Sequence, residues 1–155
     1  MVTIITAVVA FLVSWLMGFW LIPFLKEIHF GQTILDIGPK WHKSKQGTPI
    51  MGGFLFICGT IVAVLVGFLV LSATEQDYFT SENYMQNVKL IAGFVMALLF
   101  AFVGFMDDYI KAVKKQNLGL NAKQKMVLQI LIACAYLATI YLAGDKSTVV
   151  TIPLL

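Results

Sequence analysis

Residues 46–74 read QGTPIMGGFLFICGTIVAVLVGFLVLSAT, a stretch without a single charged side chain. A helix needs about 20 mainly apolar residues to cross the hydrocarbon core of a bilayer, which is about 30 Å thick. The stretch is long enough to do so. It therefore predicts a transmembrane helix over about 50–73.

Three further uncharged segments lie on either side of it, and they predict helices over about 2–25, 90–106 and 122–144. A short apolar segment at 149–155 looks like the start of a fifth. Hydrophobic residues make up 59% of the 155 positions and charged residues 12%, whereas soluble domains are about 25% charged. We therefore expect an all-α, polytopic integral membrane protein: one membrane domain over 1–155, with four complete transmembrane helices and the start of a fifth segment.

The lysines predict an orientation in the membrane. Four lie within 26–45 and five within 111–125, whereas the connection 75–89 holds one lysine and three acidic residues. By the positive-inside rule, the two lysine-rich connections face the cytoplasm and the N-terminus lies outside. The sequence contains no arginine, so it lacks the planar side chain that reads bases and grips phosphates bidentately. Nucleic-acid binding is disfavoured.

Two adjacent carboxylates, Asp107 and Asp108, end the third apolar segment. If the helix continues, Asp107, Lys111 and Lys115 lie four residues apart on one face, and Asp108 lies three residues from Lys111. Adjacent acids at a helix C-terminus repel each other and oppose the helix dipole, so they favour a role with a cation, a proton or a phosphate. The lysines alone are also explained as membrane anchors.

The predicted depth of these acids separates two functional classes. A helix that starts near Lys89 rises about 26 Å over the apolar segment and places Asp107 at the membrane surface. Coupling carboxylates of transporters lie near the midplane instead. A surface position suits an enzyme that joins a water-soluble substrate to a lipid headgroup.

Glycines and lysines mark the neighbouring connections. Gly119 predicts a helix end, and Asn121 with Gln124 predicts a capping box at the next helix start. Lys123 and Lys125 then fall in the first turn, where they form an anion site with free backbone N–H groups or anchor the helix at the headgroups. The pair Gly52-Gly53 predicts close backbone approach at the start of the second helix. His42 has no partner cluster, so no metal ligand is assigned.

Several motifs together resemble the phospho-N-acetylmuramoyl-pentapeptide transferase family. They are Phe30-Gly31-Gln32 through Gly38-Pro39 to His42, Gly47-Thr48-Pro49-Ile50-Met51-Gly52-Gly53, Gly104-Phe105-Met106-Asp107-Asp108-Tyr109, and Gly119-Leu120 through Lys123-Gln124-Lys125 to Gln129. Ile50 stands where the family pattern has threonine.

The resemblance implies a reaction. The family transfers phospho-MurNAc-pentapeptide from UDP-MurNAc-pentapeptide to undecaprenyl phosphate, which forms lipid I and UMP for peptidoglycan synthesis, with Mg²⁺. It implies catalytic roles for Asp107 and Asp108, without deciding which one acts as the base or contacts the metal. It also implies substrate-binding roles for five residues: Lys43, Thr48, Lys111, Lys115 and Lys123. The expected place is the bacterial inner membrane, in the bilayer as a multi-pass protein and possible homodimer, with the active-site loops cytoplasmic.

The resemblance covers the N-terminal half of the family's glycosyl-1-phosphate transferase fold. Family members have about ten spanning helices, which calls for a chain about twice this long. The main magnesium ligand is therefore expected outside this chain, and the chain alone is expected to be an inactive fragment. Two alternatives stay open: a related polyprenyl-phosphate N-acetylglucosamine-1-phosphate transferase, and a non-catalytic membrane scaffold or small transporter.

Overall fold

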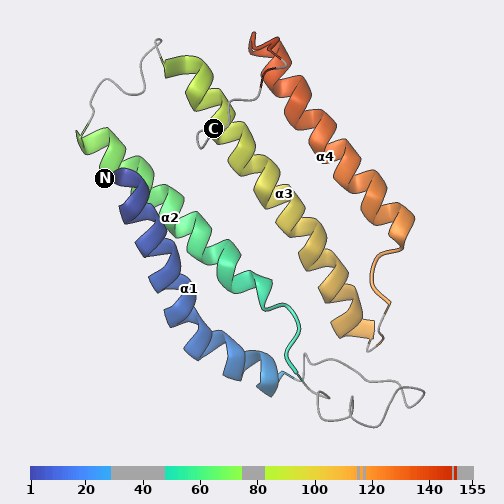
Figure 1. The fold of residues 1–155 in the computed structure, drawn as a ribbon. Helices are drawn as coiled ribbons and strands as arrows, with labels where there is room; N and C mark the ends of the chain where they lie inside the picture. Colours follow the sequence, from blue (N-terminus) through green and yellow to red (C-terminus); the bar gives the residue numbers. More distant parts are fainter. Residues whose placement is uncertain (29–47, 75–82, 115, 117, 148, 150–155) are drawn as a thin grey trace.

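Four long helices make up almost all of the computed structural model, which describes residues 1–28, 48–74, 83–114, 116, 118–147 and 149. They are α1 (Val2–Glu27), α2 (Gly53–Thr74), α3 (Tyr84–Lys114) and α4 (Ala122–Leu142). Each is long and apolar enough to cross a membrane. The helices alternate in direction along the chain (Figure 1). The prediction of an all-α polytopic membrane protein is confirmed, while all of the expected fifth segment except Val149 lies outside the described residues.

The helix boundaries agree with the sequence prediction for α1, α2 and α4 to within a few residues, but not for α3. The predicted helix covers 90–106, whereas α3 runs from Tyr84 to Lys114. Met, Gln, Lys and Ala are good helix formers and occur in the extensions at both ends, so the helix continues beyond its apolar part. Asp107 therefore lies about two turns before the end of α3 and not at its C-terminus.

Small residues on α2 form the contact with α1. Gly59, Ala63 and Gly67 recur every fourth residue and are all buried. A Cβ atom added to Gly59 would collide with Ser14 Oγ, and one added to Gly67 would lie 2.5 Å from Thr6 Cγ2. Small residues at this spacing let two membrane helices approach closely enough for extensive van der Waals contact. The sequence analysis did not single out this pattern.

The second helix pair, α3 and α4, is joined differently. Lys89 near the start of α3 forms an ion pair with Asp145 just after α4. At the opposite end, Asp107 Oδ1 lies 2.9 Å from Lys125 Nζ. Between these ends lies a cavity of about 340 Å³ that is lined by side chains of both helices, such as Val95 and Tyr136. Polar contacts at the two ends therefore hold α3 and α4 side by side.

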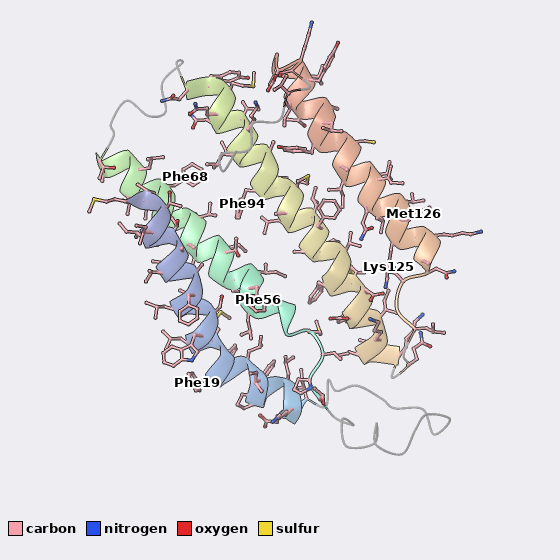
Figure 2. The ribbon with its side chains drawn as sticks, viewed as in Figure 1. Phe19, Phe56, Phe68, Phe94, Lys125 and Met126 are labelled. Carbon is pink, nitrogen blue, oxygen red and sulfur yellow. The ribbon has the colours of Figure 1, made fainter. Side chains whose placement is uncertain are left out.

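Most apolar side chains point away from the bundle. Phe19 on α1 is 66% exposed and Phe56 on α2 is 68% exposed (Figure 2). Such exposure would be very costly in water but is ordinary for helix surfaces that face lipid or further helices. The buried polar side chain in the described part of the chain is Asp107, which makes its surroundings the first place to look for function.

Candidate active site

Three motifs that are far apart in the sequence meet at one end of the helix bundle. Because the helices alternate in direction, the end of α3 lies beside the starts of α2 and α4 (Figure 1). Met51 lies just before α2, which begins at Gly53. The last turns of α3 carry the two aspartates, and the start of α4 carries Lys125. The helical topology thus assembles the candidate site.

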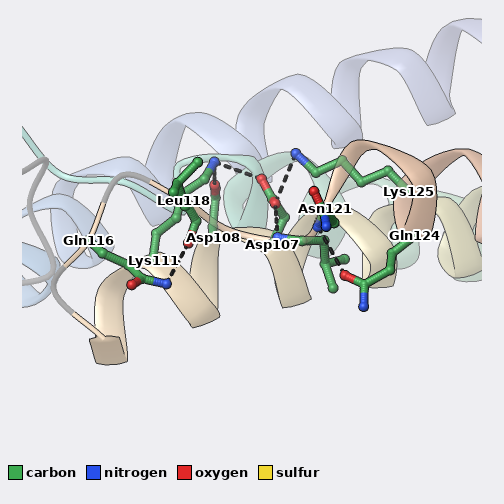
Figure 3. Close-up of polar contacts among 9 residues, drawn as sticks. Asp107, Asp108, Lys111, Gln116, Leu118, Asn121, Gln124 and Lys125 are labelled. Carbon is green, nitrogen blue, oxygen red and sulfur yellow. Dashed lines mark hydrogen bonds and ion pairs between the residues drawn. The ribbon is translucent and has the colours of Figure 1, made fainter.

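Asp107 is the centre of this site. It is only 7% exposed, and both of its carboxylate oxygens are engaged. Oδ2 lies 2.6 Å from Lys111 Nζ on the same helix face. Oδ1 lies 2.9 Å from Lys125 Nζ and accepts a 2.7 Å hydrogen bond from the backbone N–H of Leu120 (Figure 3). One carboxylate therefore connects α3, the α3–α4 connection and α4.

Asp108 is less enclosed. Its Oδ1 lies 3.3 Å from Lys111 Nζ, so Lys111 bridges the two acids (Figure 3). No partner of Asp108 Oδ2 is found among the described residues. The charges of the two aspartates are balanced by Lys111 and Lys125, which explains how adjacent acids are tolerated beside an apolar helix segment.

A cavity of about 400 Å³ opens beside the acids, between α2 and α3. Both aspartates line it, together with Gly104 and Phe105 of α3 and with Met51, Gly53 and Phe54 at the start of α2. Met51 has a φ of 71°, a left-handed conformation that is rare for residues other than glycine and is common near functional sites. Residues of two sequence motifs, one before and at the start of α2 and one near the end of α3, therefore line one cavity.

This cavity leads into apolar surroundings. A second cavity of about 250 Å³ lies further along the same two helices and shares Phe54, Ile57, Ala101 and Phe105 with the first. The site therefore has a charged end, formed by the acids, and an apolar end. Such a combination suits a substrate with a charged group attached to a hydrocarbon chain.

The predicted role of Gly52-Gly53 is wrong for the described part of the chain. A Cβ atom added to either glycine would meet no atom within 4 Å, so no neighbouring backbone approaches them. Gly53 borders the cavity instead.

Gly119 also differs from its predicted role as a helix end. The helix α3 already ends at Lys114. Gly119 lies directly against Asp107: an added Cβ would collide with Asp107 Oδ1 and lie 2.6 Å from its Cγ. By contrast, the predicted capping box at Asn121 is present, with the Asn121 N–H donating to Gln124 Oε1 at 3.0 Å.

The lysines with predicted substrate-binding roles differ in their positions. Lys111 lies beside both aspartates, and its role in substrate binding stays a prediction. Lys123 is exposed, and within the described chain no ion pair of its side chain is recorded, whereas Lys125 contacts Asp107. Thr48 is exposed, just before α2, and Lys43 and Lys115 lie outside the described residues. The choice of Lys125 over Lys123 could not be made from spacing, because the two residues point about 200° apart around the same helix.

A complete magnesium site is not formed by the part of the chain that the structure describes. No group of three His, Cys, Asp or Glu side chains lies together there. Both oxygens of Asp107 are already paired with lysines. A metal ion would therefore find one unpaired carboxylate oxygen, that of Asp108, and would need further ligands.

Comparison with known proteins gives a consistent picture. The chain is 41% identical over 135 residues to the phospho-N-acetylmuramoyl-pentapeptide-transferase of Bacillus cytotoxicus, a match that covers 87% of this chain and 38% of that protein. It is 40% identical over 146 residues to the transferase of the same name from Heliobacterium modesticaldum, covering 94% of this chain and 40% of that protein.

A third relative of the same name, from Bacillus thuringiensis, is 41% identical over 133 residues. No family model and no solved structure matches this chain. The chain spans about two fifths of the length of the curated relatives it matches. Over most of its own length, therefore, the resemblance predicted from the motifs is confirmed: this chain is similar to about two fifths of the length of phospho-N-acetylmuramoyl-pentapeptide transferases.

Proposed function

We propose that this chain contributes the aspartate-containing part of an active site that transfers phospho-MurNAc-pentapeptide from UDP-MurNAc-pentapeptide to undecaprenyl phosphate. The products are lipid I and UMP. The observation that carries the proposal is the meeting of Asp107 and Asp108 with Met51 and Gly53 around one cavity. Lys111 lies beside the two acids, and the relatives of this chain bear that enzyme name.

The geometry suits this chemistry. In the proposed step, a phosphate oxygen of the lipid bonds to the phosphorus of the sugar phosphate, and the bond from that phosphorus to UMP breaks. Phosphoryl transfer depends mainly on positioning and on neutralising negative charge. Lys111 supplies positive charge beside the acids, and the apolar end of the cavity accommodates a hydrocarbon chain. Asp107 and Asp108 are the proposed catalytic residues.

Further roles belong to the same proposal. Lys43 and Thr48 contact the nucleotide, and Lys115 and Lys123 contact phosphate groups. Mg²⁺ is the proposed cofactor, with its main ligand outside this chain. The proposed setting is the bacterial inner membrane, with the 26–45 and 111–125 connections in the cytoplasm, where a UDP-linked precursor is made, and with a homodimer as the possible assembly.

A chimeric enzyme tests the reaction. This chain replaces the matching segment of the Bacillus cytotoxicus transferase, and UMP release is measured with undecaprenyl phosphate and Mg²⁺. We expect activity with UDP-MurNAc-pentapeptide and none with UDP-N-acetylglucosamine. Asp107→Asn or Asp108→Asn should lower turnover by about 100-fold or more, the usual loss for a group that acts in the chemical step. The 155-residue chain by itself should release no UMP.

The controls separate the alternatives. Lys146→Ala, at the far end of the bundle, should leave turnover unchanged. A chimera that inserts into the membrane as well as the parent enzyme but transfers nothing would contradict the proposal. Preference for UDP-N-acetylglucosamine would point to the related transferase instead.

Cysteine labelling tests the orientation. In a variant without Cys58 and Cys134, a cysteine at Leu118 or at Ser147 is exposed to a membrane-impermeant maleimide. In intact cells, Ser147→Cys should label and Leu118→Cys should label only after the membrane is opened. The reverse pattern would place the candidate site outside the cytoplasm and remove it from its proposed substrate.

A further inference from the structure

The turn before α4 lies in direct contact with Asp107. Gly119 leaves no room for a side chain, because an added Cβ would collide with Asp107 Oδ1 and lie 2.7 Å from the Asp107 carbonyl oxygen. No positive φ is recorded at Gly119. The glycine is therefore needed for close approach and not for an unusual backbone conformation.

The next residues complete the contact. The backbone N–H of Leu120 donates to Asp107 Oδ1 at 2.7 Å, and Lys125 Nζ lies 2.9 Å from the same oxygen. A short, charge-assisted hydrogen bond and an ion pair on one atom restrict both the rotation and the position of that carboxylate. The other oxygen is held by Lys111 of the same helix.

Neighbouring residues that resemble these chemically do not share the contact. Lys123 is on the same turn of α4 but exposed, and Asp108 has Lys111 as its recorded partner in the described chain. Of the two adjacent aspartates, the contact thus involves Asp107, and of the two neighbouring lysines it involves Lys125. A set of general membrane-anchoring lysines would show no such preference.

We propose that Gly119, Leu120 and Lys125 form a clamp from the start of α4 that positions the Asp107 carboxylate at the wall of the cavity. Gly119 provides the space, the Leu120 N–H sets the orientation of Oδ1, and Lys125 balances its charge. All three are positioning residues, because they act through Asp107. The catalytic consequence of the clamp rests on the proposed transferase function, but the clamp itself does not.

Carboxyl labelling tests the clamp without any enzymatic assay. The 155-residue chain in detergent is treated with dicyclohexylcarbodiimide, which converts accessible carboxyl groups in apolar surroundings to N-acylureas. Mass spectrometry of the peptide that contains both acids gives the ratio of labelled Asp107 to labelled Asp108. We expect Lys125→Ala and Gly119→Ala each to raise this ratio several-fold, because each releases Asp107 and leaves the Asp108 partner in place.

Matched variants distinguish loss of the clamp from a general loss of helix packing. Lys125→Arg should keep the wild-type ratio, because a guanidinium restores the ion pair, and so should Lys123→Ala. If Lys125→Ala loses helicity, Lys125→Met replaces it, since it keeps the apolar stem and removes the charge. An unchanged ratio in folded Gly119→Ala and in a folded neutral variant of Lys125 would overturn the proposal.

The chimeric enzyme then measures the catalytic consequence. Lys125→Ala should lower kcat while KM for UDP-MurNAc-pentapeptide stays nearly the same, and Lys125→Arg should recover most of the rate. An equal loss in the Ala and Arg variants would contradict the positioning role in catalysis. Failure of the wild-type chimera would count against the transferase function alone, because the labelling ratio is measured independently.

Discussion

Small residues line the contact between α1 and α2, whereas α3 and α4 are joined by ion pairs at their two ends with a cavity between. In the first pair, Gly59 and Gly67 bring two helices together along their length. In the second pair, Asp107 and Lys125 connect one end, and Lys89 and Asp145 the other. The first contact is close packing along the helices, with a 3.3 Å hydrogen bond from Ser14 Oγ of α1 to the Leu55 carbonyl oxygen of α2. The second concentrates charge at the two ends of the helix pair, and at one of these ends Asp107 lines a cavity.

The comparison also shows why the candidate site lies where it does. Ion pairs inside the hydrocarbon region are expensive, whereas charged groups at its edge reach water and headgroups. Close packing of small residues needs no water and can run through the middle of the membrane. Packing against α1 can therefore hold α2 in place, and the start of α2 faces the acids across the cavity.

The largest expected effect on stability is at Gly59. Gly59→Leu should destabilise the α1–α2 pair by roughly 3 kcal/mol, because the Cβ atom alone already meets Ser14 and comes within 2.9 Å of the Ala10 carbonyl oxygen, and overpacking of this kind costs about 1–3 kcal/mol or more. Unfolding in mixed micelles of SDS and a mild detergent is the measurement.

Gly104→Ala is the matched control, since nothing lies within 4 Å of a Cβ atom there. It should be neutral or slightly stabilising, because alanine favours a helix more than glycine. Equal destabilisation in both variants would show that close packing at Gly59, Ala63 and Gly67 is not what joins α1 and α2.

A smaller effect is expected at the charged end of the second pair. Asp107→Asn should destabilise α3–α4 packing by roughly 2 kcal/mol, because it removes the charge that balances Lys111 and Lys125, and hydrogen bonds to charged groups contribute about 1.5–3 kcal/mol. Asp108→Asn should cost less, since Asp108 has a single recorded partner in the described chain, at 3.3 Å. The same unfolding measurement compares them. Equal costs would mean that Asp107 carries no special structural role.

The smallest effect on stability is expected at the other end of the α3–α4 pair, where Lys89 and Asp145 form an ion pair. Lys89, together with the Ser147 N–H, lowers the pKa of Asp145 below its ordinary value of 3.8. A lowered pKa means that the contribution to stability is present above pH 3.8 and is lost as the pH falls through the folded-state value. Wild type should therefore melt slightly above Asp145→Asn at pH 7, and the difference should vanish in strong acid.

Salt provides a second check on this ion pair. Because Lys89 is about half exposed, added salt at pH 7 should also remove the difference in melting temperature. A difference that persists in acid and in high salt would mean that Asp145 stabilises the helix pair by something other than its charge.

Several elements of the site were predictable from local pattern. Asp107 and Asp108 stand out because adjacent acids end an apolar segment, and their spacing to Lys111 depends only on helix geometry. The capping box at Asn121 likewise involves residues three apart in the sequence. The roles of Gly119 and Lys125 were missed because they depend on how α4 lies against α3. The signal available was the close spacing of Gly119, Lys123 and Lys125, which predicted either an anion site or a membrane anchor and did not select Lys125 as the partner of Asp107.

By itself, the sequence determined the all-α class, the number of membrane-spanning helices and the acidic pair, because these follow from apolar segment length and from contacts within one helix turn. The resemblance of the motifs also identified the family. Only the tertiary structure decided that Gly59 and Gly67 face α1, that Lys125 rather than Lys123 reaches Asp107, and that Met51 shares a cavity with the acids. Such choices depend on the rotation of each helix about its axis and on its distance from its neighbours, and these are set by packing between segments far apart in the chain.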